Sequence, residues 1–235
     1  MVLRKHDLSA MAEELDTPFM PEVIESLGGV EASLFVCDGQ KGWHRRADAA
    51  ELAVILEGVM TLDGADGLVV ADEGDAVRIP EGIGLKVQSG MRTNVILIHE
   101  SDALSSANGR PSLPPGAPRP PLSKSNVAVD VLSSDPFHWR EAGTVGEYRV
   151  VASRLVGAAK PFKAAGPTLA IVYRGVLDYR SGTETGSVVG SEALFVPTGT
   201  PVSLSSERGA TVLLVVGKQA ELPAPSVAEG GGERG

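Results

Sequence analysis

The stretch 74-GDAVRIPEGIGLKVQS-89 contains a short pattern, 79-IPEG-82, that returns 117 positions later as 196-VPTG-199. The same offset places 57-EGVM-60 on 174-RGVL-177 and 94-NVILI-98 on 211-TVLLV-215 without a gap. A constant offset that holds over about forty positions indicates an internal duplication. The two halves of the chain are therefore expected to be copies of one small fold.

The residues that recur in register are those that control the backbone: Gly58, Pro80 and Gly82 return as Gly175, Pro197 and Gly199. Glycine supplies a left-handed or closely packed turn, and proline fixes φ at the end of a strand. The duplication therefore preserves the residues expected at backbone turns, in addition to the pattern of apolar residues.

Between these corners the chain consists of short apolar and β-branched runs, such as LAVILEGVMTL before the middle of the sequence and TLAIVYRGVLDY after it. Such runs, separated by Gly, Pro and Asp, are typical of an antiparallel sandwich or barrel. One helix is expected near 7-DLSAMAEELD-16, with Asp7 as its cap and apolar residues at helical spacing.

Composition breaks once, at 101-SDALSSANGRPSLPPGAPRPPLSKSN-126, where proline and small polar residues replace the apolar runs. Proline stiffens the chain and removes backbone donors, which favours an extended linker. We expect four parts: an N-terminal barrel over 1–102, a Pro-rich linker over 103–126, a C-terminal barrel over 127–220 and a disordered tail over 221–235.

The 235 residues carry a net charge of −9, and 43% of them are apolar. An acidic chain of globular composition without a basic cluster is a poor binder of nucleic acid or anionic lipid. The single cysteine, Cys37, excludes an intrachain disulfide and lies in an apolar run, 33-SLFVC-37, where a packing role is expected. No apolar run approaches the roughly 20 residues of a membrane helix. These features predict a cytoplasmic protein with no nucleic-acid or membrane partner.

The paired stretches resemble the two motifs of the cupin superfamily, whose members are small double-stranded β-helix, or jelly-roll, barrels. The first motif of that family is G-x5-H-x-H-x3–4-E-x6-G and the second is G-x5-P-x-G-x2-H-x3-N. The resemblance implies an all-β fold of two tandem cupin barrels related by a pseudo-twofold axis, with a short N-terminal helix. It also implies that three histidines and a glutamate bind a divalent metal in many relatives, and that two copies could form a homodimer through their sheet edges.

Within 42-GWHRRADAAELAVILEG-58, His44 takes the place of the first histidine and Arg46 that of the second. Glu51 matches the glutamate, and Gly58 follows at the expected distance. In the second motif Leu85 replaces the third histidine. Two of the four metal ligands of the family are therefore missing from the first half.

The second half departs further from the pattern. Its four ligand positions hold Pro161, Lys163, Thr168 and Val202. None of these side chains is a good ligand for a divalent metal, so we expect the second barrel to bind no metal by the arrangement of the family.

Residues two apart on a strand share a face, so His44 and Arg46 can both point into the barrel and approach Glu51. One imidazole and one carboxylate fall short of the roughly three protein ligands that a catalytic metal needs. The permanent charge of Arg46 would repel a dication and could instead pair with Glu51. We predict a direct contact between Arg46 and Glu51, no metal and no other cofactor.

Three interpretations of His44, Arg46 and Glu51 stay open on sequence alone: a buried ion pair that only holds strands together, a ligand site for a small polar or anionic molecule, or a metal site. A metal bound by His44 and Glu51 would need another ligand, for which His99 is a candidate on a face that the sequence does not identify. A cavity at Glu51 would favour ligand binding, and a barrel filled by Leu85 and Val87 would favour structure alone.

The expected function is that of a metal-independent cupin that binds a small molecule or plays a structural part, with its site in the N-terminal barrel. The alternative is a cupin enzyme of the isomerase, epimerase or dioxygenase type acting on a small polar or anionic metabolite. In that alternative Glu51 and His44 act as bases or ligands, and Arg46 binds the anionic group of the substrate.

Overall fold

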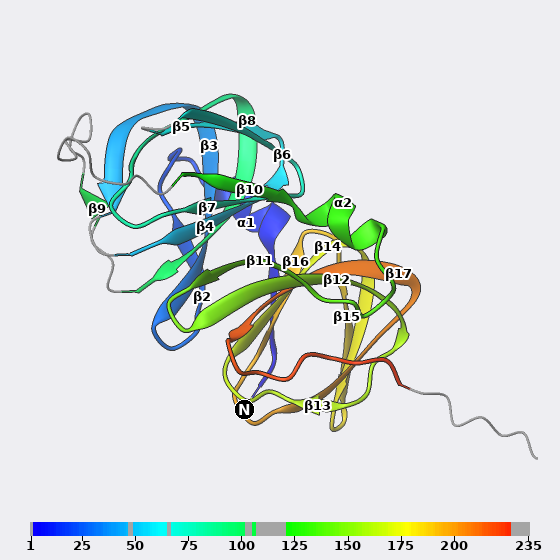
Figure 1. Ribbon diagram of the computed structural model, residues 1–235. Helices are drawn as coiled ribbons and strands as arrows, with labels where there is room; N and C mark the ends of the chain where they lie inside the picture. The colour runs from blue at the N-terminus through cyan, green and yellow to red at the C-terminus, as the bar shows by residue number, and fades with distance from the viewer. Residues whose placement is uncertain (1, 47–48, 65–66, 102–104, 107–120, 227–235) are drawn as a thin grey trace, which may run out of the picture.

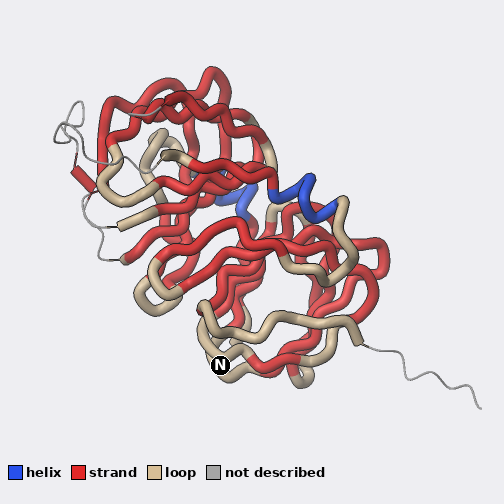
Figure 2. The backbone as a smooth tube through the Cα atoms, viewed as in Figure 1, coloured by secondary structure: helices blue, strands red, loops and turns tan. Residues whose placement is uncertain are grey.

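The computed structural model describes residues 2–46, 49–64, 67–101, 105–106 and 121–226, with the backbone alone at 43–46 and 105–106. Most of these residues lie in two antiparallel sheets (Figures 1 and 2). The predicted all-β class is confirmed.

The first sheet has nine strands, of which six follow the order β10-β7-β4-β8-β3-β2. Its strands are β2 (Glu22–Ser26), β3 (Val30–Arg46), β4 (Glu51–Glu57), β5 (Val59–Gly64), β6 (Gly67–Asp72), β7 (Asp75–Ile79), β8 (Gly84–Glu100), β9 (Ser105–Ser106) and β10 (Ser123–Asn126). Strands β5 and β6 form a hairpin that joins this path through β8, and β9 pairs with β3.

The second sheet has eight strands, and its main path is β1-β16-β14-β17-β12-β11. Its strands are β1 (Arg4–Asp7), β11 (Arg140–Val145), β12 (Tyr148–Ala158), β13 (Phe162–Lys163), β14 (Thr168–Ser181), β15 (Glu184–Val189), β16 (Glu192–Val196) and β17 (Pro201–Gly217). Taken in chain order, β4, β7 and β8 occupy the same places in the first path as β14, β16 and β17 in the second. Neither path closes on itself.

Strand β4 shows how the cores form. Its even-numbered residues, such as Leu52 and Val54, pack in a cluster that both sheets share, whereas Ala53 and Ile55 pack in a cluster inside the first sheet. Successive side chains of a strand point to opposite faces, and here both faces are buried, so the strand reads as a continuous apolar run. A third cluster fills the inner face of the second sheet.

Two short helices, α1 (Leu8–Glu14) and α2 (Val127–Leu132), lie where the sheets meet (Figure 2). The expected helix is confirmed together with its cap, because the Asp7 side chain accepts a hydrogen bond from the Ala10 amide at 2.9 Å. Asn126 caps α2 in the same way at 2.8 Å, a helix that the sequence did not suggest. Among the described residues, no helix has the length and apolar character needed to cross a membrane.

Two strands are exchanged between the sheets. Strand β1 pairs with β16, with Arg4 opposite Phe195, so the beginning of the chain completes the sheet that the second half builds (Figure 1). Strand β10, at the end of the segment predicted as a linker, pairs with β7 in the first sheet, with Asn126 opposite Asp75. Each sheet is therefore completed by a segment that neighbours the other sheet in sequence.

The segment 221–226, at the beginning of the region predicted as a disordered tail, is held by hydrogen bonds. The Trp139 indole donates to the Pro223 carbonyl at 2.8 Å, and the Lys160 amide donates to the Ala224 carbonyl at 2.7 Å. Leu222 packs against the inner cluster of the second sheet. The Ser226 amide also donates to the Ala158 carbonyl at 2.9 Å, so the segment is attached to the second sheet as far as Ser226.

The exchanged strand β1 is also tied to the first sheet by its side chains. The Nε and Nη2 atoms of Arg4 donate to the two carboxylate oxygens of Glu25 on β2 at 2.7 and 2.6 Å, and His6 Nε2 lies 2.8 Å from the same carboxylate. Burial alone would raise the pKa of Glu25, which is 7% exposed, but the hydrogen bonds from Arg4 and His6 outweigh it and lower that pKa below its ordinary value of 4.5.

Part of the stability should therefore depend on pH through Glu25. Because its pKa is lower in the folded chain, ionised Glu25 stabilises the fold above pH 4.5, and this contribution is lost as the pH falls from there through the folded pKa. Urea unfolding of the wild type and of Glu25→Gln at about pH 7 and about pH 3.5 measures it. The wild type should lose more free energy of unfolding between the two pH values than the variant, and equal losses would contradict this role.

Candidate functional site

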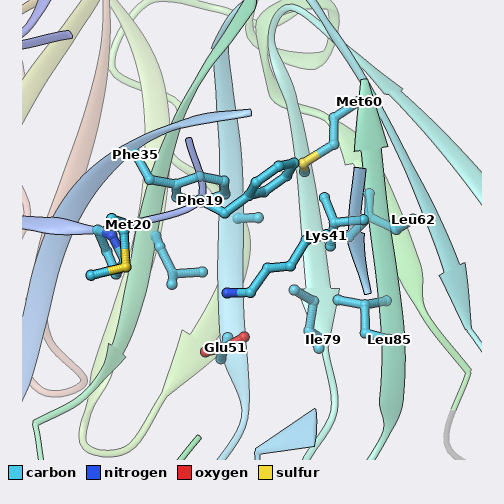
Figure 3. A pocket seen from close by; sticks show the side chains of 13 residues that line it. Phe19, Met20, Phe35, Lys41, Glu51, Met60, Leu62, Ile79 and Leu85 are labelled. Carbon is cyan, nitrogen blue, oxygen red and sulfur yellow. The ribbon is translucent and has the colours of Figure 1, made fainter. Parts of the chain in front are cut away.

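The inner face of the first sheet encloses a cavity of about 180 Å³. Most of its walls are apolar, and the side chains come from the segment before β2 and from strands β3, β4, β5, β7 and β8 (Figure 3). Its apolar walls include Phe19, Phe35, Met60, Leu62, Leu85 and Leu97. Met20, a wall residue that is 60% exposed, marks where the cavity approaches solvent.

Two charged side chains enter this apolar space. Glu51 is the first residue of β4 and is 5% exposed, and Lys41 lies in the C-terminal half of β3. Figure 3 shows the Lys41 ammonium pointing across the cavity toward the Glu51 carboxylate. Opposite charges in an environment with little water interact more strongly than on the surface, so this end of the cavity is strongly polar.

His99 lies directly opposite Glu51 in the pairing of β4 with β8. Since it has the strand parity of Leu97, which lines the cavity, His99 lies on the inner face, a point that the sequence left open. Its Nδ1 lies 3.1 Å from the Glu100 carbonyl oxygen, which can only accept a hydrogen bond. In the neutral ring Nδ1 therefore carries the proton, and Nε2 accepts from the Ser33 hydroxyl at 3.1 Å. These bonds fix the imidazole beside the polar end of the cavity.

Of the three predicted site residues, Glu51 lies in the cavity. His44 is opposite Leu85 in the ladder, and Arg46 is opposite Ser105. The side chains of His44 and Arg46 fall outside the described residues, so the contact predicted between Arg46 and Glu51 stays a prediction.

The described side chains do not fit the metal site of the resembling family. Leu85, at the position of the third histidine, lines the cavity with a side chain that has no ligand atom. The Lys41 ammonium faces the carboxylate with which a dication would have to pair (Figure 3). Within the part of the chain with described side chains, no group of three or more His, Cys, Asp or Glu residues could hold a metal ion.

Cys37 belongs to the inner cluster of the first sheet, next to the cavity walls in the core. Burial, with a smaller contribution from Asp38, raises the pKa of its thiol to about 12. The thiol therefore stays protonated at neutral pH, which agrees with the packing role predicted from the sequence.

The second sheet has no charged pair at the equivalent positions. Thr168 takes the place of Glu51, and Ala159 donates its amide to Leu204, the counterpart of the Val87 that pairs with Lys41. Thr168 and Ala159 are both buried. The second sheet therefore forms without an ammonium and a carboxylate at these positions.

Lys41 was missed from the sequence because 38-DGQKG-42 reads as a turn. In the structure β3 continues through it, and the register between β3 and β8 shifts between Lys41 and His44. The available signal was strand parity, since Lys41 has the same parity as Phe35, a wall of the cavity. A prediction that ends the strand at Cys37 cannot apply this parity to Lys41.

Neither a protein-family model nor a curated protein sequence matches the chain. Solved structures do match along nearly its whole length. A cupin 2 conserved barrel domain protein from Leptotrichia buccalis has a TM-score of 0.68 and 14% identity, and the match covers 92% of this chain and 96% of that protein.

Two further solved structures are similar. A variant of salicylate 1,2-dioxygenase from Pseudoaminobacter salicylatoxidans gives a TM-score of 0.71 at 13% identity, covering 92% of this chain and 84% of the dioxygenase. A protein described as glyoxylate-induced, from Pseudomonas aeruginosa, gives 0.63 at 14% identity, covering 96% and 91%. At such identities the likeness concerns the fold. The chain therefore has the fold of the cupin superfamily, which confirms the resemblance predicted from its paired motifs.

Proposed function

We propose that this chain is a metal-independent cupin that binds a small molecule in the cavity of its first sheet. The observation that carries the proposal is the cavity itself, a largely apolar space of about 180 Å³ with Lys41 and Glu51 at one end. Binding sites for small molecules are typically concave, mostly apolar and supplied with a few convergent polar groups. A purely structural barrel has no need of such a space, since unfilled volume in a core is destabilising.

The walls and the charges define the class of ligand. The apolar body should be about the size of one aromatic ring, because an engineered cavity of about 150 Å³ is known to bind benzene. The ligand would carry a single polar group, neutral or anionic, that accepts a hydrogen bond from the Lys41 ammonium. Molecules with many hydroxyl groups are disfavoured, since the apolar walls cannot replace their hydrogen bonds to water.

The proposal includes the finer architecture: two cupin barrels related by a pseudo-twofold axis, only the first of which keeps a binding cavity. Support comes from the corresponding strand orders of the two sheets and from the glycines and prolines at equivalent positions. It also comes from the packing of Ala170, the counterpart of Ala53, between Leu194 and Leu214 in the core of the second sheet.

This correspondence gives a matched pair of variants. Ala53→Leu should place its larger side chain in the cavity and change the free energy of unfolding by less than about 1 kcal/mol, whereas Ala170→Leu should overpack a filled core and cost about 1–3 kcal/mol. Urea unfolding of both variants measures the difference. If both substitutions were equally destabilising, the first sheet would be as tightly packed as the second, and the proposal would lose its basis.

Binding itself can be followed with benzyl alcohol and benzoate as probes. The methyl groups of Met20 and Met60, both cavity walls, should shift in NMR spectra of the wild type and saturate in the millimolar range or tighter. Ala53→Leu should abolish these shifts because it fills the space. Methyl shifts that persist in Ala53→Leu would place the probes elsewhere.

A second function has one specific observation in its favour. The Glu51 carboxylate is buried in the cavity with His99 opposite it, an arrangement suited to proton transfer in a cupin enzyme of the isomerase, epimerase or dioxygenase type. Elemental analysis of the untagged protein, dialysed against manganese, iron, nickel or zinc, separates the two functions. Near-stoichiometric metal that disappears in both His44→Ala and Glu51→Ala would favour the metal-dependent enzyme over the metal-independent binder.

A further inference from the structure

The Lys41 amine is placed unlike the other lysines with described side chains. It lies in an apolar cavity and faces a carboxylate, whereas Lys5 and Lys124, for example, form ion pairs at the edge of the molecule with side chains that are 41% and 38% exposed. The equivalent position of the second sheet holds Ala159, so the barrel fold does not require an amine there. The fold of the second sheet therefore gives no reason for an amine at this position of the first.

A primary amine in a hydrophobic pocket is a nucleophile toward carbonyl compounds, provided that a neighbouring group moves protons. We propose that Lys41 binds small apolar aldehydes covalently, as a reversible imine, with Glu51 as the proton-transfer group and counter-ion. The inference rests on the proposed function, because the aldehyde must first enter the cavity. It specifies the ligand class of that site and the atom that holds the ligand.

The reaction needs only groups that the site contains. The Lys41 ammonium gives a proton to the Glu51 carboxylate, and the neutral Nζ forms a bond to the carbonyl carbon while the C=O π bond breaks. The oxygen takes that proton back from Glu51, and the nitrogen gives one of its own protons to the Glu51 carboxylate, which leaves a neutral carbinolamine beside a protonated Glu51. A proton from Glu51 then helps the hydroxyl leave as water, and a C=N bond forms. The product is a protonated imine paired with the Glu51 carboxylate, and no oxidant or reductant takes part.

The surroundings favour this product over the free amine and aldehyde. Apolar walls such as Phe19, Phe35 and Met60 exclude bulk water, which would otherwise hydrolyse the imine. The cationic imine keeps its counter-ion, because the Lys41 nitrogen already points toward Glu51 (Figure 3). The size of the space selects an aldehyde with about one aromatic ring, such as benzaldehyde.

The test is reductive trapping. The full chain is incubated with benzaldehyde and sodium cyanoborohydride, and the benzylated lysines are located and timed by peptide mass spectrometry. Lys41 should be benzylated at least about tenfold faster than Lys86, a partly exposed lysine on β8 outside the cavity lining, and benzyl alcohol should slow Lys41 alone. Lys41→Arg should abolish the fast adduct, and Glu51→Gln should slow its formation about tenfold or more.

Controls separate this inference from the binding function on which it rests. Lys86→Arg should leave the fast adduct unchanged. If Lys41 reacts no faster than Lys86 while benzyl alcohol still shifts the Met60 methyl signal, the imine is overturned and the binding function stands. If benzyl alcohol also fails to shift that signal, the cavity admits no ligand of this class and both proposals fail. An undiminished rate in Glu51→Gln would remove Glu51 from the reaction.

Discussion

Gly175→Ala should lower the free energy of unfolding by about 3 kcal/mol or more, the largest effect that we expect from removing or adding a single carbon. Gly175 has a φ of +87°, and a Cβ built there would overlap the Gly209 carbonyl oxygen and lie 3.0 Å from the Ala210 Cα. Both atoms belong to the backbone of β17, so neither can move away without disturbing the ladder. The register of β14 against β17 shifts at this point, which makes Gly175 the corner of the strand.

Thermal and urea unfolding would measure this loss, and at about 2–4 °C per kcal/mol the melting temperature should fall by roughly 10 °C. Gly182→Ala is the matched control, because Gly182 also has a positive φ, +59°, but a Cβ there meets nothing within 4 Å. That control should show only the conformational penalty of about 1 kcal/mol. Equal effects at the two positions would mean that the close approach of β14 and β17 contributes nothing.

Asp75→Ala should cost about 2–4 kcal/mol, because it removes a buried acceptor that three donors share. Asp75 is 1% exposed. One carboxylate oxygen accepts from the Asn126 amide at 2.8 Å, and the other accepts from Lys124 Nζ at 2.8 Å and from the Asp72 backbone amide at 2.9 Å. Without the carboxylate, the side-chain amide of Asn126 and the backbone amide of Asp72 lose their partner in a partly buried place.

The neighbouring Asp72→Ala is the control, since that side chain is exposed and the substitution should stay within about 0.5 kcal/mol. Hydrogen exchange offers a second measurement, in which Asp75→Ala should speed exchange most strongly in β10, the strand that Asp75 holds. A variant that unfolds like Asp72→Ala and protects β10 fully would show that backbone pairing alone keeps this strand in place.

The fold could be predicted from the sequence because its corners are set locally. Gly58 and Gly175, which are 117 positions apart in the sequence, adopt positive φ angles of 89° and 87°, a conformation that favours glycine. The cap of α1 is equally local, since Asp7 bonds an amide three residues ahead. Ser191 stands in the second half where Gly74 opens the second motif in the first half. Its backbone is still left-handed, with a φ of 63°, so this turn is kept although the glycine is not.

The exchange of β1 and β10 could not be predicted in this way. The four residues of β1, RKHD, have no apolar alternation, and their partner Phe195 lies near the other end of the sequence. The same limit applies to the site. Glu51 was identified from its motif, but Lys41 enters the cavity through the path and register of a long strand, which are set by pairing with β8 rather than by neighbouring residues.

Because Arg4 pairs with Phe195, the order of synthesis matters for this protein. The partner of the first strand is made about 190 residues later, a delay on the order of 10–40 s at ~5–20 residues per second. During that time β1 would leave the ribosome as a lone edge, the kind of segment that recruits other chains. Its sequence, RKHD, is charged rather than apolar. We therefore expect β1 to stay unpaired without promoting aggregation until β16 of the second sheet has been synthesised.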